Sequence, residues 1–362
     1  MMNAKSFLLF TFILLYAAMV KAQLPDYNKR VHLLYNGINK KLKDHKNGLY
    51  YETTDTLKKE NLHSWLWPLC ALIQGSNQME AVETGKNYML PVEQAIDQYY
   101  NDQPPFPAYQ DYVRKERLSS RFYDDNEWVA IAYMDAYHRN HKEKYLQVSE
   151  MIFRFINSGV DSTAGGGVYW KEGDLHTKNT CSNGPAVLVA LQLYQVTKKP
   201  EYLNRALEIY RWTNQHLQSP GGLFYDHIKI PSMAIGKAFY TYNTGTMLQS
   251  NALLYKITKD KKYLAEAERI AAAGKAYFFK AGRLPNEYWF NAVMLRGYEE
   301  LYRIDKNKGW ISFFAEDANQ IWEKERDEDN LLGNKPAKRL IDQAAMIEIY
   351  ARLQRLALDN KK

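Results

Sequence analysis

The chain has 362 residues, two cysteines and a formal net charge of +7. A charge this mild, with basic residues interspersed among acids rather than aligned in a stripe, argues against nucleic-acid binding. The length leaves room for two average domains or for one large toroid, so the periodicity of the sequence has to decide between them.

The N-terminus has the three regions of a secretory signal peptide: the charged start Met1-Met-Asn-Ala-Lys5, an apolar stretch over 6–20, and the small-residue end Val20-Lys-Ala22. We expect cleavage after Ala22. The apolar stretch is shorter than the roughly 20 residues of a membrane-spanning helix, and no later segment is long and apolar enough to span. A periplasmic or secreted protein is expected, since no lipoprotein cysteine lies at the cleavage point.

A repeated phrase predicts helices in pairs. The phrase is a polar, lysine-rich turn followed by Tyr-Leu, and it occurs three times, ending at Tyr145-Leu, Tyr202-Leu and Tyr263-Leu. Each copy joins an apolar helix to a charged amphipathic one. Tyrosines 137, 194 and 255 close the apolar helices about every 60 residues, and the pattern continues less regularly to Tyr298 and Tyr350. Inner helices, apolar on most faces, are expected at 64–73, 128–137, 185–194, 247–255, 289–298 and 342–350. Outer helices are expected at 28–44, 78–100, 145–157, 202–217, 263–279 and 311–324.

Twelve helices in six hairpins favour an all-α fold, a closed (α/α)6 toroid, because neither end offers a polar capping repeat. Residues 23–362 would then form a single catalytic domain after the signal peptide at 1–22. The long loops 101–123, 158–183 and 218–244 all precede inner helices, and loops longer than about 15 residues are usually functional. One rim of the toroid is therefore expected to carry the function.

The sharpest chemical signal is the pair Asp124-Asp125, at the start of the inner helix predicted over 128–137. Cleavage of a sugar acetal needs one carboxylic acid and one carboxylate. The alternative is a capping box, with Asp124 as the N-cap and Glu127 as its partner. We expect Asp124 to be extended and Asp125 helical, so that both can face one cleft.

Three motifs resemble glycoside hydrolase family 76, the α-1,6-mannanases. They are Tyr123-Asp-Asp-Asn-Glu-Trp128, Gly165-Gly-Gly-Val-Tyr-Trp170 followed by Lys178-Asn-Thr-Cys-Ser-Asn-Gly184, and Tyr242-Asn-Thr-Gly245. The resemblance covers essentially the whole mature chain. Thr244 departs from the pattern, because relatives often have Gln there, and this puts one sugar hydrogen bond in doubt.

The resemblance implies an (α/α)6 barrel that cleaves α-1,6-linked mannose with retention, with Asp124 as nucleophile and Asp125 as general acid/base. Neighbouring residues, about 3.8 Å apart at Cα, reach the roughly 5–5.5 Å carboxyl spacing of retaining enzymes more readily than the longer inverting spacing. Asp125 must then have a raised pKa, from the charge of Asp124 and from burial beneath Trp128 and Tyr123.

Aromatic and amide side chains near this rim are candidate sugar-binding residues, because sugar rings stack on aromatic faces and amides hydrogen bond to hydroxyl groups. The alternative role of the aromatics is core packing, and that of the amides is helix capping. The predicted substrate-binding residues are Trp65, Tyr123, Trp128, Tyr169, Trp170, Asn183, Tyr242, Asn243, Tyr288 and Trp289.

No cofactor and no metal site is expected. His138 and His141 lie at the short-loop end without an acidic or cysteine partner, so surface histidines are expected there rather than metal ligands. Cys70 and Cys181 could pair in an oxidising compartment, although a buried thiol is the more ordinary role for Cys70, which apolar residues flank. The expected partner is an α-mannan polysaccharide, bound by a monomer.

The sequence therefore predicts a retaining, endo-acting α-1,6-mannanase. A transglycosylase on α-mannosides and a non-catalytic carbohydrate-binding protein remain the alternatives. A further possibility is another toroidal sugar enzyme, such as an unsaturated glucuronyl hydrolase or a sugar 2-epimerase. The epimerase is less favoured because it would need rim histidines, and His176 and His227 lie in loops without an evident second partner.

Overall fold

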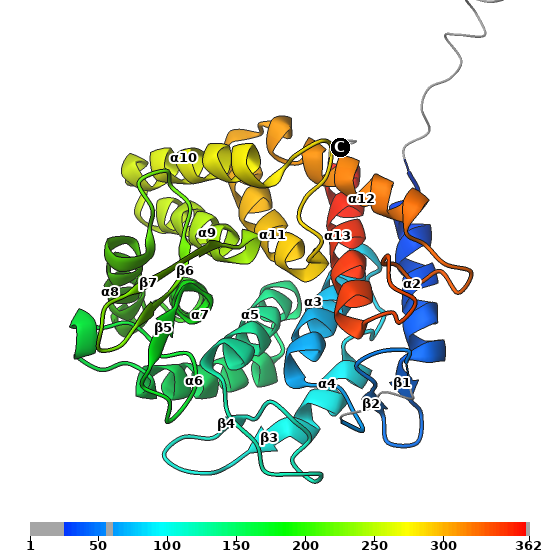
Figure 1. Ribbon diagram of the computed structural model, residues 1–362, viewed down its shortest axis with the longest axis horizontal. Helices are drawn as coiled ribbons and strands as arrows, with labels where there is room; N and C mark the ends of the chain where they lie inside the picture. The colour runs from blue at the N-terminus through cyan, green and yellow to red at the C-terminus, as the bar shows by residue number, and fades with distance from the viewer. Residues whose placement is uncertain (1–24, 56–60, 360–362) are drawn as a thin grey trace, which may run out of the picture.

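The computed structural model describes residues 25–55 and 61–359, and within them six inner helices form a closed ring (Figure 1). Each inner helix packs against the next, and the last packs against the first, which closes the circle. The inner helices are α3 (Leu66–Val82), α5 (Tyr123–Asn140), α7 (Thr180–Thr197), α9 (Thr241–Thr258), α11 (Tyr288–Asp305) and α13 (Leu340–Asp359). The predicted (α/α)6 architecture is confirmed.

An outer layer of helices surrounds this ring, and each presents a buried apolar stripe to it. The stripe is the mark of an amphipathic helix with one face in water. The N-terminal helix α2 packs against the C-terminal α13, so the two ends of the described chain lie side by side (Figure 1). The outer helices are α2 (Tyr27–Lys41), α4 (Leu90–Ile96), α6 (Glu143–Ser158), α8 (Pro200–Leu217), α10 (Lys261–Phe278) and α12 (Ser312–Lys324).

The outer helix predicted over 78–100 is wrong in extent. The inner helix α3 runs on to Val82, and the outer helix is only Leu90–Ile96, followed by the 3-10 turn Asp97–Tyr99. Gly85 has a φ of +83° in the connection between them. Glu83 is the C-cap of the first helix, and the left-handed Gly85 two residues later turns the chain before the second helix begins.

Four inner helices repeat one design. Helices α5, α7, α9 and α11 are each 18 residues long, and a residue in the left-handed region follows each of them. The N–H groups of these residues donate to Tyr137, Tyr194, Tyr255 and Tyr302. Tyr302, rather than the predicted Tyr298, therefore continues the tyrosine repeat. Tyr298 is instead buried and donates its hydroxyl to the carbonyl of Ala271.

Amide side chains near the start of the inner helices hold the preceding loops. Asn126 bonds to both the N–H and the carbonyl of Tyr109, Asn183 does the same to Val168, and Gln343 the same to Leu332. Each clamp satisfies two buried backbone groups of a loop that has no sheet partner there. Thr244 occupies the corresponding place in α9, is fully buried and does not face the rim cavity described below.

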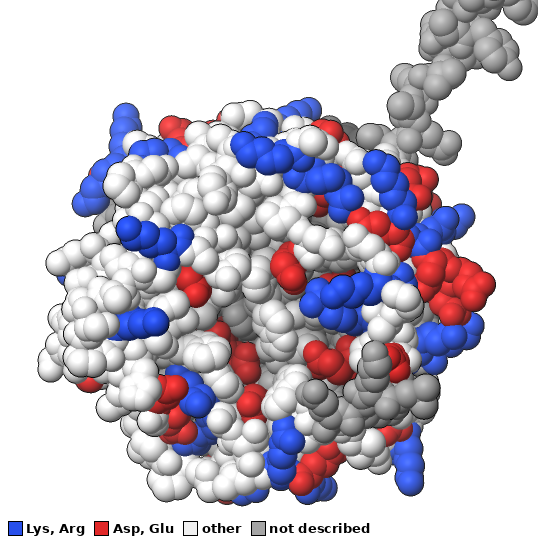
Figure 2. All heavy atoms as spheres, viewed as in Figure 1, with Lys and Arg blue, Asp and Glu red and all other residues white. Residues whose placement is uncertain are grey.

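Short strands lie at the rim where the inner helices begin, and the sequence patterns did not indicate them. The pairs are β1 (Lys43–Asp44) with β2 (Leu49–Tyr50) and β3 (Tyr100–Asn101) with β4 (Ala108–Tyr109). An antiparallel sheet of β5 (Thr177–Asn179), β6 (Tyr225–Lys229) and β7 (Ile235–Phe239) covers part of the mouth. Figure 2 looks onto this face and shows a central hollow with acidic side chains inside and mostly uncharged atoms around it.

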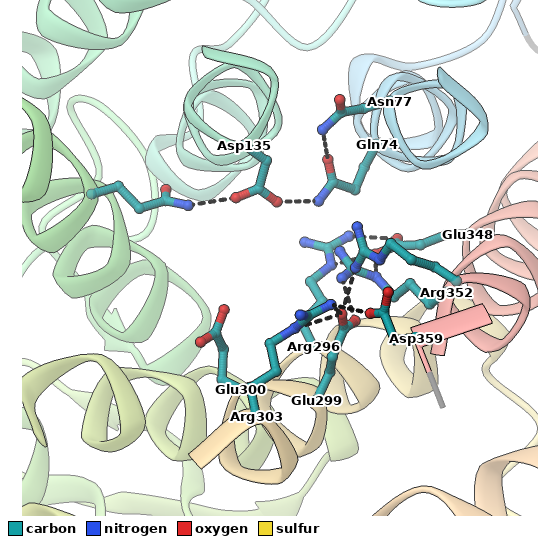
Figure 3. A network of polar contacts seen from close by, with 12 residues as sticks. Gln74, Asn77, Asp135, Arg296, Glu299, Glu300, Arg303, Glu348, Arg352 and Asp359 are labelled. Atoms are coloured by element: carbon teal, nitrogen blue, oxygen red, sulfur yellow. Dashed lines mark hydrogen bonds and ion pairs between the residues drawn. The ribbon is translucent and has the colours of Figure 1, made fainter. Parts of the chain in front are cut away.

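Paired charges gather at the opposite end of the ring (Figure 3), where several of them line a second cavity of about 620 Å³. Arg296 forms two bonds of 2.7 Å to Glu348, and Arg352 bonds to both Glu348 and Glu299. Arg303 and Arg355 also pair with Glu299. Cations at this end also oppose the negative ends of the inner-helix dipoles. The guanidinium of Arg296 lies over the ring of Trp128, so the network supports the floor of the hollow from below.

No helix in the described ranges is both long and apolar enough to cross a bilayer. The predicted signal peptide, residues 1–22, lies outside the described residues.

We predict that Glu348→Gln lowers the free energy of unfolding by about 3–5 kcal/mol, because it leaves Arg296 buried without a carboxylate. Urea denaturation measures the change. The control is Glu208→Gln, which removes the acid of the exposed pair with Arg205 and should cost less than about 1 kcal/mol. Equal losses in the two variants would contradict a supporting role for the buried pair.

Candidate active site

The hollow at the rim is a cavity of about 730 Å³ that holds both Asp124 and Asp125. Inner helices, the loop before α5 and the strands β5 and β6 all contribute to its wall. The remaining lining residues are Trp65, Trp67, Asp111, Phe122, Trp128, Trp170, Thr177, Asn179, Cys181, Asp226, His227, Tyr240, Tyr242, Trp289 and Phe290.

Asp124 and Asp125 both lie in the first turn of α5, which begins at Tyr123. The N-cap residue is Phe122, and its side chain makes no capping bond. The expectation that Asp124 is extended is therefore wrong, and so is the capping-box alternative. Successive helical residues point about 100° apart. In the first turn no earlier turn of helix covers them, and both side chains reach the cavity.

The two carboxyl groups differ in their hydrogen-bond partners. Asp124 accepts bonds from the indole Nε1 of Trp170 and from the backbone N–H of Asp125, each at 3.1 Å. The thiol of Cys181 is a third donor to it. No group in the described part of the chain hydrogen bonds to the Asp125 carboxyl. Donors stabilise the ionised form of a carboxyl group, so this asymmetry favours ionised Asp124 beside protonated Asp125.

The pKa values of the pair follow the same order. Desolvation raises the pKa of Asp124 to about 6, against the lowering effect of Cys181, Trp170 and the N–H of Asp125. Desolvation also raises the pKa of Asp125 well above its usual range, and the charges of Asp124 and Asp111 add to the rise. The expected raised pKa of Asp125 is borne out in direction. Near neutral pH one proton is therefore shared unequally by the pair.

Glu127 is a third acid on the same helix, wholly buried one turn below the pair. Neither of its carboxyl oxygens has a hydrogen-bond partner among the described residues. Burial raises its pKa well above the usual range, and the charges of Asp124 and Asp125 add to the rise. Glu127 is consequently protonated at neutral pH, because an unpaired buried carboxylate would be too costly.

Aromatic side chains form most of the cavity wall. Trp289 lies 5.1 Å from Trp67 and 5.0 Å from Trp128, measured between ring centroids, and Tyr242 stacks on Phe290 at 4.1 Å. Of the predicted substrate-binding residues, Trp65, Trp128, Trp170, Tyr242 and Trp289 line the cavity. Trp170 is 39% exposed, so its indole can meet a ligand as well as Asp124.

The other five predicted substrate-binding residues do not line the cavity. Tyr123 is buried against Phe155, and Tyr288 donates its hydroxyl to Glu325. Tyr169 bonds to Asp161. Asn183 is committed to its loop clamp, and Asn243 is fully buried beneath the rim. All five side chains are buried and lie outside the cavity wall, so the structure does not bring them to a sugar and their role in binding stays a prediction.

The glycine run 165–167 is a turn, as expected, and it belongs to the loop that positions Trp170. All three glycines have positive φ, and a Cβ at Gly167 would come within 2.6 Å of Trp212. The buried ammonium of Lys178 bonds to Asp161 and to the carbonyls of Thr163 and Gly166. The loop is thereby fixed from inside, and its end holds the indole of Trp170 against Asp124.

Sequence reasoning missed the residues that the sheet brings to the cavity. Pairing of β5 with β6 places Asp226 and His227 in the wall, about 50 residues along the chain from β5. His227 lies on β6 rather than in a loop, and its Nδ1 lies 2.9 Å from the carboxyl of Asp226. A Cβ at Gly236 would come within 2.4 Å of the His227 ring, and the glycine in β7 is the only local sign of that packing.

Cys70 and Cys181 are both free and buried. The thiol of Cys70 contacts the carbonyl of Asp125 at 3.3 Å, and Cys181 lines the cavity. Among the described residues no group of three or more His, Cys, Asp or Glu side chains could hold a metal ion.

Comparison with known proteins assigns residues 28–308 to the model of the glycosyl hydrolase family 76. A mannan endo-1,6-alpha-mannosidase from Candida glabrata is 28% identical over 184 residues, which are 46% of this chain and 41% of that protein. A similar enzyme from Saccharomyces cerevisiae is 26% identical over the same shares. The matched region thus spans less than half of these curated relatives.

Solved structures match over a larger share. A family 76 mannosidase from Bacteroides thetaiotaomicron is 26% identical, with a TM-score of 0.85 over 93% of this chain and all of that one. An α-1,6-mannanase from a Salegentibacter species shares the fold at 21% identity, with a TM-score of 0.78 over 90% of this chain and 98% of that one. That structure is an inactive variant, with two consecutive aspartates replaced by asparagine, in complex with α-1,6-mannotriose.

The protonated state of Glu127 predicts a pH-dependent stability. An unfolded glutamate loses its proton near pH 4.3, whereas Glu127 keeps its proton in the folded protein to a higher pH. The folded state therefore binds more protons in this window, and its stability falls as pH rises. Glu127→Gln should remove this loss. As pH rises, the free energy of unfolding of the variant should therefore increase relative to that of the wild type by up to about 1.4 kcal/mol per pH unit.

Urea denaturation between about pH 5 and pH 8 measures this difference. The control is Glu201→Gln, which removes an exposed carboxyl from α8. Parallel curves for E127Q and the wild type would show that Glu127 is ionised in the folded protein.

Proposed function

The chain belongs to glycoside hydrolase family 76, and we propose from this premise that it hydrolyses α-1,6-mannosidic linkages in mannan. The observation that carries the proposal is the pair Asp124-Asp125, with three hydrogen-bond donors on one carboxyl and none on its neighbour. Two titratable groups whose surroundings separate their pKa values are the arrangement that divides acid and base roles.

The proposed reaction is a double displacement with retention. The Asp124 carboxylate attacks the anomeric carbon and forms a covalent ester, while Asp125 donates its proton to the departing glycosidic oxygen. Asp125, now ionised, takes a proton from a water molecule whose oxygen attacks the same carbon. The ester bond breaks, Asp124 is released as a carboxylate, and Asp125 is protonated again.

The relatives support the substrate class. The curated proteins are named for α-1,6 linkages in mannan, and the Salegentibacter protein binds α-1,6-mannotriose and, in a second inactive variant, α-1,6-mannotetrose. The aromatic wall of this chain offers stacking faces for such sugars. The hollow opens on the surface of the rim (Figure 2), which supports internal cleavage of a chain. We also propose export from the cell, on the N-terminal sequence alone.

Asp124→Asn and Asp125→Asn should each lower kcat on linear α-1,6-mannan by at least about 10²-fold, because each removes a group that bonds to or protonates the substrate. Reducing-end release measures the rate, and circular dichroism confirms folding. Glu201→Gln is the control and should keep the wild-type rate. Rates near wild type in the folded D124N and D125N variants would overturn the proposal.

The products separate the remaining alternatives. Early formation of the α-anomer, followed by NMR, supports retention, and early fragments of many sizes support endo action. Longer oligosaccharides formed with an added acceptor would instead indicate a transglycosylase. Mannan binding without any reducing ends would indicate a carbohydrate-binding protein.

Trp170→Phe keeps an aromatic ring but removes the indole donor to Asp124. The carboxylate loses stabilisation, its pKa rises, and a higher pH is needed to ionise it. The acid limb of the pH profile of kcat/KM, expected near the Asp124 pKa of about 6, should therefore move up by about one unit. An unchanged midpoint with a raised KM would show that Trp170 only contacts the sugar.

A further inference from the structure

Arg117 is a fixed cation at the edge of the cavity. Its guanidinium carbon lies 4.2 Å from the ring centroid of Tyr112 and 5.0 Å from that of Trp65. Trp65 lines the cavity, and the two rings meet edge to face at 5.3 Å. Arg117 itself is exposed. Stacking on two rings holds a guanidinium in place without using its N–H donors.

The loop beneath Arg117 is rigid. The buried amide of Gln110 donates to the carbonyls of Arg117 and Tyr112, each at 2.8 Å. Asn101 in turn donates to Gln110, and the N–H of Arg117 bonds to Val113. Buried contacts thus fix the backbone around Arg117, and the rings of Tyr112 and Trp65 hold its guanidinium, so less conformational entropy is lost when a ligand binds there.

The charge of Arg117 acts on the nearby carboxyl of Asp111, but the two groups are not in direct contact. Among the described residues it forms no ion pair and no side-chain hydrogen bond. Its neighbour Glu116 pairs instead with His63, and Glu172 pairs with Arg121. All five guanidinium donors are therefore free for a ligand.

A second cation lies on the same side of the cavity. The ammonium of Lys171 lies 5.8 Å from the ring of Phe122, another lining residue, and 3.8 Å from the nearer oxygen of Asp174. Arg117 and Lys171 both act on the lining residue Asp111: burial raises the pKa of that carboxyl, while Ser119 and these two cations lower it. The two positive groups thus flank one stretch of the wall.

We propose that Arg117, assisted by Lys171, forms a subsite for a phosphate-type anionic substituent on the mannan chain. The inference rests on the proposed function. A sugar stacked on Trp65 would place its substituents next to the guanidinium of Arg117. A guanidinium is planar and can donate two parallel hydrogen bonds to two oxygens of one phosphate. Neutral hydroxyl groups would gain only ordinary hydrogen bonds from the same donors, so the subsite discriminates by charge.

The test compares linear α-1,6-mannan with the same mannan after chemical phosphorylation. Arg117→Gln should lower kcat/KM on the phosphorylated polymer by about five- to tenfold, since an exposed charged hydrogen bond is worth less than a buried one. On the neutral polymer the change should stay within about twofold. Arg117→Lys should keep part of the preference, and the difference should shrink above about 0.3 M salt.

Lys115→Gln is the matched control, because it removes the same charge from the same exposed loop and should affect both polymers equally. Equal losses for R117Q on both polymers, no loss on either, or the same selectivity in K115Q would each overturn the subsite. Calorimetric binding of the phosphorylated polymer to the D124N variant, with and without R117Q, tests it without turnover. Failure of the wild type to cleave neutral mannan would instead count against the proposed function.

Discussion

Two adjacent carboxyl groups in a desolvated cavity cannot both be ionised at neutral pH, because each charge raises the cost of the other. The site of this protein depends on that constraint. The carboxyl of Asp124 accepts hydrogen bonds from Trp170, Cys181 and the N–H of Asp125. These donors stabilise the ionised form of Asp124, so the proton is held by Asp125. Helix α5 supplies both groups from one turn, and the separation of roles arises from their neighbours rather than from distance along the chain.

The ring serves this arrangement in two ways. Inner helices run from the rim to the far end, so their N-terminal turns and their long loops gather around one hollow. The buried pair of Arg296 and Glu348 lies on the far side of Trp128 and supports it. Buried amides fix the loops onto the helix starts, as Asn183 does for the loop that carries Trp170. A donor that must meet Asp124 is thereby held by contacts that do not involve substrate.

Much of the fold and the aspartate pair of the candidate site could be predicted because their signals are local. Helical periodicity placed the inner and outer layers, and consecutive aspartates at a helix start are visible without any tertiary information. The sequence alone does not tell whether Tyr288 or Trp289 faces the cavity. Neighbouring helical residues point about 100° apart, so the rotation of α11 about its axis decides which of the two does. Asp226 and His227 depend on the pairing of β6 with β5 across a long chain separation, which no local pattern encodes.

The most direct test of the divided carboxyl pair is to trap the covalent intermediate with a 2-deoxy-2-fluoro mannosyl donor that has a good leaving group. Peptide mass spectrometry then locates the ester. A sugar attached to Asp124, with hydrolysis of the trapped ester slowed in the D125N variant, is the predicted result. Attachment to Asp125, or turnover that inverts the anomeric centre without any adduct, would contradict the assignment.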